Sequence, residues 1–273
     1  MPSNNEERGE LAGQVALVTG SGRGLGNHIA KALIAMGADV AMHDISEEAP
    51  AQFGEFETLT AAAAALRVNN ARTTSVVGDI TNEATVAAMV EKIEADLGKI
   101  DILVNCAGGD IGVKGKPNPN DSLHTAMEDV RIVVERNFFG TMIMCRAIVP
   151  GMIERQHGSI VNIGSVNAHY GLDNEVAYSC AKAAVIHYTR CLANAGRVHG
   201  VRANAISPGP AKTARFMATR TLDAAAMESS VSLDRYAEPQ EIADAVAMLC
   251  SPKARYINGQ VVRVDGGALL FPG

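Results

Sequence analysis

The sequence contains no tryptophan, and aromatic residues make up only 4% of its 273 residues. With a hydrophobic share of 47%, its core must be built from aliphatic side chains. The chain also lacks any stretch near the roughly 18 uninterrupted apolar residues of a membrane-spanning helix. Its first eight residues are polar and carry no apolar segment of the kind found in signal peptides. We therefore expect neither a membrane span nor a secretion signal.

Paired cysteines and basic clusters are missing too. The odd number of cysteines shows no C-x-x-C spacing: Cys106, Cys145, Cys180, Cys191 and Cys250. This pattern fits a reduced, cytoplasmic setting better than a disulfide framework or a zinc site, and it favours cysteines that are buried as small apolar residues. No cluster of His, Cys and Asp suggests a metal. The net charge is −6 without a basic block, so nucleic acid is not an expected partner.

Apolar runs typical of buried strands alternate with segments of helical periodicity along nearly the whole chain. The predicted strands span 14–18, 38–42, 75–78, 101–104, 159–163, 201–206 and 259–265, and the predicted helices span 29–36, 61–66, 82–97, 122–156, 174–198 and 239–250. This order predicts an α/β protein with one Rossmann-like, doubly wound parallel sheet of about seven strands and helices on both faces. We expect a flexible tail over 1–10, one domain over 11–273, and a substrate flap at 211–235 within it.

A glycine-rich turn follows the first strand. Residues 19–26 read Thr-Gly-Ser-Gly-Arg-Gly-Leu-Gly, a helix comes next, and the second strand ends at Asp44. Glycines allow backbone to approach a pyrophosphate, and the helix N-terminus offers free N–H groups and a positive dipole end. Strand, glycine turn, helix, strand and acid together indicate a dinucleotide site.

The acid at the end of the second strand indicates which dinucleotide binds. Asp44 can accept hydrogen bonds from the adenosine ribose, and it would repel a 2′-phosphate by up to about 4 kcal/mol per pair of unit charges at 4 Å and an effective dielectric of 20. We therefore expect NAD rather than NADP. Arg23 is the opposing signal, because a guanidinium can bind a phosphate; we interpret it instead as a solvent-facing residue at the start of the helix.

A second pattern lies at the predicted helix 174–198. Tyr178 and Lys182 are four residues apart and so share one helical face. A cation beside a phenol lowers the pKa of the phenol, which then exchanges protons near neutral pH. Ser165 follows the strand 159–163, close to the start of this helix. Taken alone, such a Tyr–Lys pair is more often an exposed pair of neighbours. Asn137 interrupts an apolar helix face, where local backbone could satisfy it.

These motifs together resemble the short-chain dehydrogenase/reductase family over about residues 11–267. The resemblance implies that Tyr178 is the general acid/base, that Lys182 lowers its pKa and holds the nicotinamide ribose, that Ser165 binds the substrate oxygen, and that Asn137 orders a water in a proton relay. It also implies that Asp79 and Ile80 meet the adenine. The expected cofactor contacts are Gly20, Gly22, Arg23, Gly24, Leu25, Gly26, Asp44, Asp79, Ile80, Asn105, Ala107, Gly108, Tyr178, Lys182, Pro208, Gly209 and Thr213.

The family implies hydride transfer between NAD(H) and a secondary alcohol or ketone, without a metal. The tentative substrate contacts are Ser165, Asn167, His169, Tyr178 and Phe216, with Tyr170, Pro210 and Met217 nearby. Keto-acyl thioesters, steroids, cyclic diols and sugars all fit. An NADPH-dependent ketoreductase of the 3-oxoacyl thioester type, a non-catalytic NAD-binding regulator and an epimerase or dehydratase acting on nucleotide sugars remain alternatives. The family further suggests a homotetramer paired through 122–156 and 174–198.

Overall fold

The computed structural model describes residues 9–67, 71–228 and 231–270. Most of the expected tail therefore lies outside the described residues. Of the rest, Glu10 forms an ion pair with Lys253, and Leu11 is fully buried and donates its N–H to the Met36 carbonyl at 2.8 Å. The domain thus begins with a residue that is anchored in the core.

Seven parallel strands form one sheet in the order β3-β2-β1-β4-β5-β6-β7, which confirms the predicted fold class. The strands are β1 (Val15–Val18), β2 (Asp39–Asp44), β3 (Thr73–Val77), β4 (Ile100–Asn105), β5 (Gly158–Ile163), β6 (Val201–Pro208) and β7 (Val261–Val264). The chain runs outward from β1 to β3 and then returns to place β4 on the other side of β1. This reversal leaves a crevice at the carboxyl ends of β1 and β4, where ligands bind in open α/β sheets.

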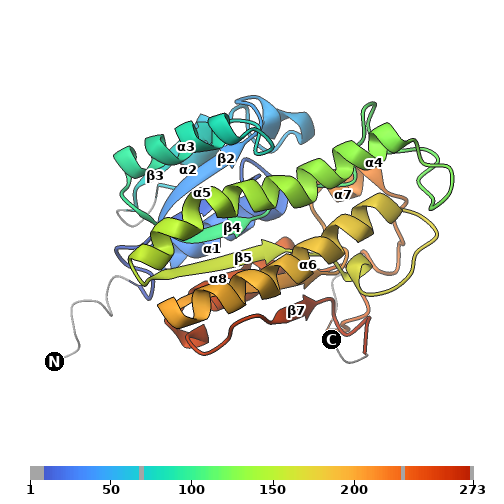
Figure 1. Ribbon diagram of the computed structural model, residues 1–273. Coiled ribbons are helices and arrows are strands. Elements are labelled where there is room, and N and C mark those ends of the chain that lie inside the picture. The colour runs from blue at the N-terminus through green and yellow to red at the C-terminus, as the bar shows by residue number, and fades with distance from the viewer. Residues whose placement is uncertain (1–8, 68–70, 229–230, 271–273) are drawn as a thin grey trace.

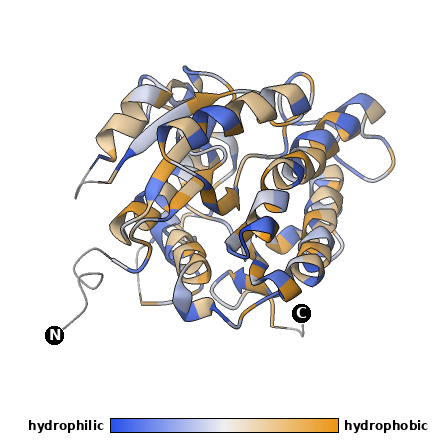
Figure 2. Cartoon of the chain, turned by 60° about the vertical axis from the view of Figure 1, so that its left-hand side comes forward, coloured by the Kyte–Doolittle hydropathy of each residue, from blue (hydrophilic) through white to orange (hydrophobic). Residues whose placement is uncertain are grey.

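Helices cover both faces of the sheet (Figure 1). They are α1 (Gly24–Ala35), α2 (Leu59–Ala65), α3 (Glu83–Asp96), α4 (Met127–Val134), α5 (Gly140–Glu154), α6 (Val176–Gly196), α7 (Ala214–Thr219) and α8 (Pro239–Cys250). One apolar core packs α1, α2 and α8 against the sheet, and the other packs α3, α5 and α6. Figure 2 shows hydrophobic and hydrophilic residues alternating along the helices, as expected when one helical face meets a sheet.

Five short segments have tighter or wider helical turns. Four are 3-10 turns, at Ala49–Phe53, Val166–Ala168, Arg197–His199 and Pro252–Ala254, and one is a π-helical turn at Glu135–Phe139 between α4 and α5. None of the described helices is long and apolar enough to cross a membrane.

The predicted helix over 122–156 begins later than expected, at Met127. The Asp121 carboxylate accepts the N–H groups of Leu123 and His124 at 2.8 and 2.6 Å, which folds 122–126 into a turn. The expectation that all cysteines are buried is wrong for two of them. Cys180 and Cys191 are exposed, because they lie outside the buried face of α6.

Candidate active site

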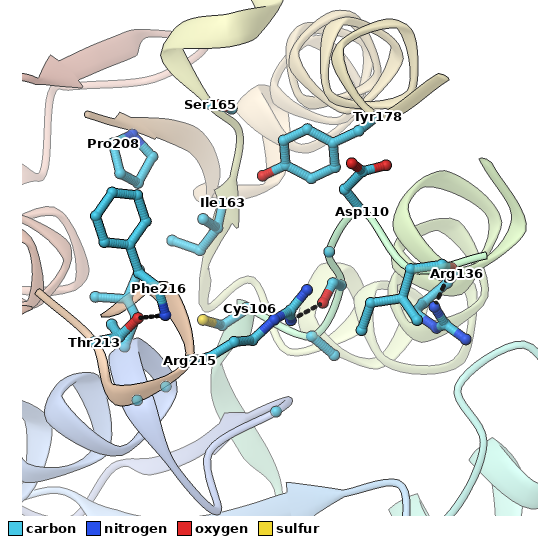
Figure 3. Close-up of a pocket in the computed structure, with 18 of the residues that line it drawn as sticks. Cys106, Asp110, Arg136, Ile163, Ser165, Tyr178, Pro208, Thr213, Arg215 and Phe216 are labelled. Carbon is cyan, nitrogen blue, oxygen red and sulfur yellow. Dashed lines mark hydrogen bonds between the residues drawn. The ribbon is translucent and has the colours of Figure 1, made fainter. Parts of the chain in front are cut away.

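A cavity of about 1090 Å³ opens at the carboxyl ends of the strands. Its volume is at the upper end for ligand pockets, which suits a ligand larger than a single small substrate. Most of the residues predicted from the sequence line it (Figure 3): Gly20, Arg23, Gly24, Leu25, Gly26, Asp44, Asp79, Ile80, Ala107, Gly108, Ser165, Asn167, Tyr178, Lys182, Pro208, Gly209, Pro210, Thr213 and Phe216. The fold therefore brings the glycine turn and the Tyr–Lys pair to one cavity.

The glycine turn between β1 and α1 depends on positions that exclude a side chain. Gly20 and Gly24 have φ angles of 66° and 54°, a region that L-residues rarely adopt. A Cβ at Gly26 would collide with the carbonyl oxygen of Gly20. Thr19 fixes the turn, because its hydroxyl oxygen accepts hydrogen bonds from the N–H groups of Cys106 and Ala107 at 3.0 Å each. The turns after β1 and β4 are thus held together as one cradle.

His43 fastens the same cradle to β3. Its Nδ1 accepts the N–H of Gly20 at 3.3 Å, and its Nε2 lies 3.0 Å from the Gly78 carbonyl. A nitrogen that accepts a hydrogen bond carries no proton, so this arrangement requires the neutral ring with the proton on Nε2. Burial lowers the pKa of His43 below 6.5, against the opposing effects of the Gly78 hydrogen bond and of Asp44 and Asp79.

Asp44 is 8% exposed at the end of β2, and its Oδ1 accepts the N–H of Ile45 at 2.9 Å. Gly22 makes room for this carboxylate, since a Cβ at Gly22 would come within 2.8 Å of the other carboxylate oxygen. Gly22 itself is not among the residues lining the cavity. Its contribution is to leave space for the acid.

The interpretation of Arg23 as a solvent-facing residue is wrong. Its guanidinium donates to the carbonyl of Ala49 at 2.8 Å and to the side chain of Gln52 at 2.7 Å, and it lies 4.9 Å from the centre of the Phe53 ring. These contacts hold the turn Ala49–Phe53 against the cradle, where Gln52 and Phe53 line the cavity. The irregular segment after β2 is therefore a wall of the nucleotide end of the cavity.

The same segment delivers an acid that the sequence did not suggest. Glu55 accepts the N–H of Gly24, at the N-terminus of α1, at 2.8 Å. Its other carboxylate oxygen, Oε1, is buried and has no hydrogen-bond partner. A carboxylate at this N–H shows that the start of α1 accepts an anion, which is what a dinucleotide pyrophosphate requires. The residues of this turn therefore fit a dinucleotide pyrophosphate, and the Glu55 carboxylate lies where a negatively charged phosphate would bind.

Tyr178 and Lys182 lie on the first turns of α6, and Lys182 is 3% exposed. The Lys182 ammonium donates to the Ile163 carbonyl at 2.7 Å and lies 5.7 Å from the centre of the Tyr178 ring. Burial lowers the pKa of Lys182 to about 8. Ser165 caps the turn Val166–Ala168 at the end of β5, and its hydroxyl lies close enough to Tyr178 to influence the pKa of that phenol.

The expected lowering of the Tyr178 pKa by Lys182 is not found. Burial raises the pKa of this phenol, and the Ser165 hydroxyl and the positive charge of Arg215 only oppose that rise. The physical reason is that burial lowers the pKa of Lys182 below that of the phenol, so the ammonium loses its proton before Tyr178 does, whereas Arg215 of α7 keeps its positive charge. Figure 3 shows the Arg215 guanidinium between α7 and the loop after β4, where it contacts the Gly108 carbonyl at 3.3 Å.

Asn137 is fully buried in the π-helical turn. Its amide nitrogen donates to the carbonyls of Val133 and Gly109 at 2.8 and 2.9 Å, and its oxygen accepts the Gly109 N–H at 2.9 Å. Gly108 is packed between Asn137 and Lys182, since a Cβ there would collide with the Asn137 oxygen and come within 3.5 Å of the Lys182 nitrogen. Through these contacts Asn137 holds the loop after β4 against the π-helical turn. Its role in a proton relay stays a prediction.

Besides Gly22 and Asn137, four of the residues expected near the ligands do not line the cavity: Asn105, His169, Tyr170 and Met217. Asn105 is 3% exposed and donates to Asn162 at 2.8 Å, which joins β4 to β5 inside the sheet. His169 is turned toward β6, where its Nε2 lies 2.9 Å from the Ser207 hydroxyl. Tyr170 and Met217 are 43% and 39% exposed, so both face outward.

Charged residues that the sequence gave no reason to select gather at the substrate end. Glu175 is 6% exposed at the start of α6 and pairs with Arg220 and, at 2.9 Å, with Lys116. It also accepts a hydrogen bond from Asn167 at 2.9 Å. Asp110 and Arg136 complete the group (Figure 3). Glu175 thereby joins the loop after β4, the turn after β5 and the segment after α7.

Comparisons with known proteins agree with this geometry. A family model described as enoyl-(acyl carrier protein) reductase matches residues 20–268. The chain is 33% identical over 260 residues to the 3-oxoacyl-[acyl-carrier-protein] reductase FabG of Escherichia coli (strain K12), covering 94% of this chain and 98% of that protein. It is 32% identical over 271 residues to a cyclohexanol dehydrogenase of Rhodococcus sp. (strain TK6), covering 94% and 96%.

A solved structure is similar over the same length. It is a crystal structure from Agrobacterium tumefaciens that is provisionally assigned as a gluconate dehydrogenase, with a TM-score of 0.82 and 28% sequence identity, covering 96% of this chain and 98% of the other. A parallel sheet with a nucleotide cradle at its carboxyl ends, beside a Tyr–Lys pair, defines a nicotinamide-dependent oxidoreductase. The chain belongs to the short-chain dehydrogenase/reductase family.

Proposed function

We propose that the protein is an NAD(H)-dependent oxidoreductase that acts on a secondary alcohol or the corresponding ketone, with Tyr178 as the general acid/base. The observation that carries the proposal is the meeting of Ser165, Tyr178 and Lys182 with the glycine cradle at one cavity. The names of the relatives support the same reaction class, since they include a cyclohexanol dehydrogenase and a gluconate dehydrogenase.

The glycine cradle, with the start of α1, would hold the pyrophosphate, and Asp44 would hold the adenosine ribose. Gly20, Gly24 and Gly26 leave the backbone open, and the Asp79–Ile80 pair, Ala107–Gly108 and Pro208–Gly209 would flank the adenine, ribose and nicotinamide. Thr213, which caps α7, would meet the carboxamide. When bound, the nicotinamide accepts or supplies the hydride.

Tyr178 would take the hydroxyl proton of an alcohol as the carbinol hydrogen leaves as hydride, and would return the proton to a carbonyl in the reverse direction. Ser165 would hydrogen-bond the reacting oxygen. The positive charge of Arg215 would favour the phenolate, which burial otherwise disfavours. Asn137 would hold the loop that faces Lys182, in addition to any part in a proton relay.

The preference for NAD is supported by the charges at the adenosine end. Asp44 places a carboxylate there, whereas Arg23 is held by Ala49, Gln52 and Phe53. The second candidate is an NADPH-dependent ketoreductase of the 3-oxoacyl thioester type, which the similarity to FabG favours. A titration that follows the fluorescence of NADH and NADPH separates the two, with tighter binding of NADH expected.

The Tyr178→Phe variant tests the catalytic proposal. We expect turnover of secondary alcohols, read as NADH absorbance, to fall by about 100-fold or more, since general acid–base catalysis contributes 10²–10⁴-fold. NADH binding should stay nearly unchanged, because phenylalanine keeps the ring. Substantial residual activity would contradict the role of Tyr178. A wild-type protein that binds NADH but turns over no alcohol or ketone would instead favour a regulatory NAD-binding protein.

Three further features belong to the same proposal. The segment 211–235 would act as a substrate flap, because Phe216 lines the cavity and packs edge-on against Tyr236 with ring centres 5.1 Å apart.

We propose a homotetramer paired through 122–156 and 174–198. The side chain of Phe139 beside α5 is 48% exposed, which supports an interface there, and light scattering can measure the oligomeric state. A cytoplasmic location is proposed from the unpaired cysteines.

A further inference from the structure

The loop after β4 carries a buried acid with an unused hydrogen-bonding position. Asp110 is 5% exposed and lines the cavity. Its Oδ2 accepts the side-chain N–H of Asn120 at 2.6 Å, whereas its Oδ1 is buried and has no hydrogen-bond partner. Buried carboxylate oxygens are normally hydrogen-bonded, because an unpaired one loses its water without compensation. An unpaired oxygen in a ligand cavity therefore points to a donor on the ligand.

This acid lies close to the proposed reacting centre. Figure 3 shows the Asp110 carboxylate directed toward the ring of Tyr178. Its negative charge acts on Tyr178, although burial and the Ser165 hydroxyl have larger effects on the pKa of that phenol. A substrate whose oxygen meets Ser165 and Tyr178 would thus bring its neighbouring carbon atoms near Asp110.

The charges around Asp110 decide which kind of donor fits. Arg215 lies beside Asp110 and Tyr178, and burial lowers the pKa of its guanidinium. Arg136 donates to the Ile111 carbonyl at 2.6 Å, and Lys116 pairs with Glu175 on the same side. With Lys116 neutralised by Glu175, the two guanidinium groups of Arg215 and Arg136 would repel an ammonium group on the ligand. A neutral hydroxyl meets no such repulsion and can donate its proton to the free oxygen.

We propose that Asp110 is a specificity-determining residue that accepts a hydrogen bond from a second hydroxyl of the substrate, close to the reacting carbon. The substrate class is then a vicinal diol, a polyol or the corresponding hydroxyketone, rather than a simple alcohol. This inference rests on the proposed alcohol–ketone chemistry at Tyr178. It adds the group that selects the substrate.

Matched substrates that differ by one hydroxyl test the proposal. The pairs are a vicinal cyclohexanediol against cyclohexanol in the oxidation, and acetoin against butanone in the reduction. For the wild-type protein we expect kcat/KM to be at least about 10-fold higher for the hydroxylated member, because a site built to bind a hydroxyl discriminates against an analogue without it. In Asp110→Ala the ratio should fall toward one, mainly through loss of activity on the hydroxylated member.

Asp121→Asn is the matched control. Asp121 is an acid of the same loop that lies outside the cavity lining, and asparagine keeps the acceptor for the N–H groups of Leu123 and His124. This variant should leave the ratio unchanged. If Asp110→Ala does not fold, Asp110→Asn keeps the shape of the side chain; its single oxygen is then used by Asn120, so an amide NH2 group takes the place of the free acceptor and the ratio should still fall. A structural role alone would lower both activities together and leave the ratio as it was.

The outcomes separate this inference from the proposed function. Equal kcat/KM for the two members of each pair, or an unchanged ratio in both Asp110 variants, would overturn the assignment of Asp110 while the oxidoreductase proposal stands. Higher activity on a vicinal amino alcohol than on the diol would overturn the choice of a hydroxyl. No turnover of either pair by protein that binds the cofactor, with NAD supplied for the alcohols and NADH for the ketones, would contradict the proposed function itself.

Discussion

Glu55→Gln should tighten the binding of NADH. In the structure the Glu55 carboxylate accepts the N–H of Gly24 at the start of α1, where we place the pyrophosphate. The cofactor must therefore break this bond and displace a negative charge before its own phosphates reach that N–H. Glutamine keeps the size of the side chain but removes its charge, so it competes less strongly for the same donor.

The magnitude follows from the contact. A hydrogen bond to a charged group contributes about 1.5–3 kcal/mol, and a neutral one about 1 kcal/mol. Glu55 is half-buried, which favours the lower end of the charged range. The difference of about 0.5 kcal/mol corresponds to a fall in Kd of about two- to threefold, and relief of the repulsion between carboxylate and phosphate adds to this fall. The repulsive part should shrink as salt is added, because exposed charges are then screened.

A fluorescence titration with NADH measures this effect. Glu57→Gln is the matched control, since Glu57 is an exposed acid two residues further on and outside the cavity lining. Adenosine is the matched ligand, because it lacks the phosphates and should bind equally to the wild-type protein and Glu55→Gln. Unchanged or weaker NADH binding in Glu55→Gln, or tighter binding of adenosine as well, would refute competition between Glu55 and the pyrophosphate.

Two further predictions concern the scaffold of the site. Burial lowers the pKa of His43 in the folded state below its ordinary value of 6.5, so the unfolded chain binds more protons at this residue. The free energy of unfolding should therefore fall as the pH drops from 6.5 toward the folded pKa. Denaturant unfolding measures this fall, and His43→Gln should reduce its slope in that pH window. Asn137→Ala removes the hydrogen-bond partner of three backbone groups of Val133 and Gly109. We expect the free energy of unfolding to fall by about 3 kcal/mol and the Tm in calorimetry to fall by at least about 5 °C, whatever the effect on turnover.

The regular elements were predictable because burial imposes a periodic pattern on them. The run Val15–Val18 is buried at every residue, as a central parallel strand requires. The helix Pro239–Cys250 was predicted with the bounds that it has, since Pro239 stands at its first turn and the apolar residues recur along one face. The start of α4 was missed because a turn made by the Asp121 side chain leaves no mark on the hydrophobic pattern.

The residues of the Tyr–Lys pair were predictable, but their electrostatics were not. Helical spacing placed Tyr178 and Lys182 on one face of α6, and both line the cavity. The pKa of a phenol depends on all the charges around it, however, and these come from distant segments. Arg215 lies 37 positions further along the chain, and the burial that lowers the pKa of Lys182 below that of the phenol cannot be read from helical spacing.

The side chains that distinguish this cavity come from the irregular segments between the regular elements. Glu55 reaches the cradle only because Arg23 holds the turn Ala49–Phe53 against α1. Asp110 keeps one oxygen unpaired because Asn120, from the far end of the same loop, uses the other. Both acids lie in irregular segments, which have no periodic hydrophobic pattern from which their positions could be predicted. One acid faces the proposed phosphates and the other the proposed substrate, so cofactor affinity and substrate choice can change independently while β1, α1 and α6 stay as they are.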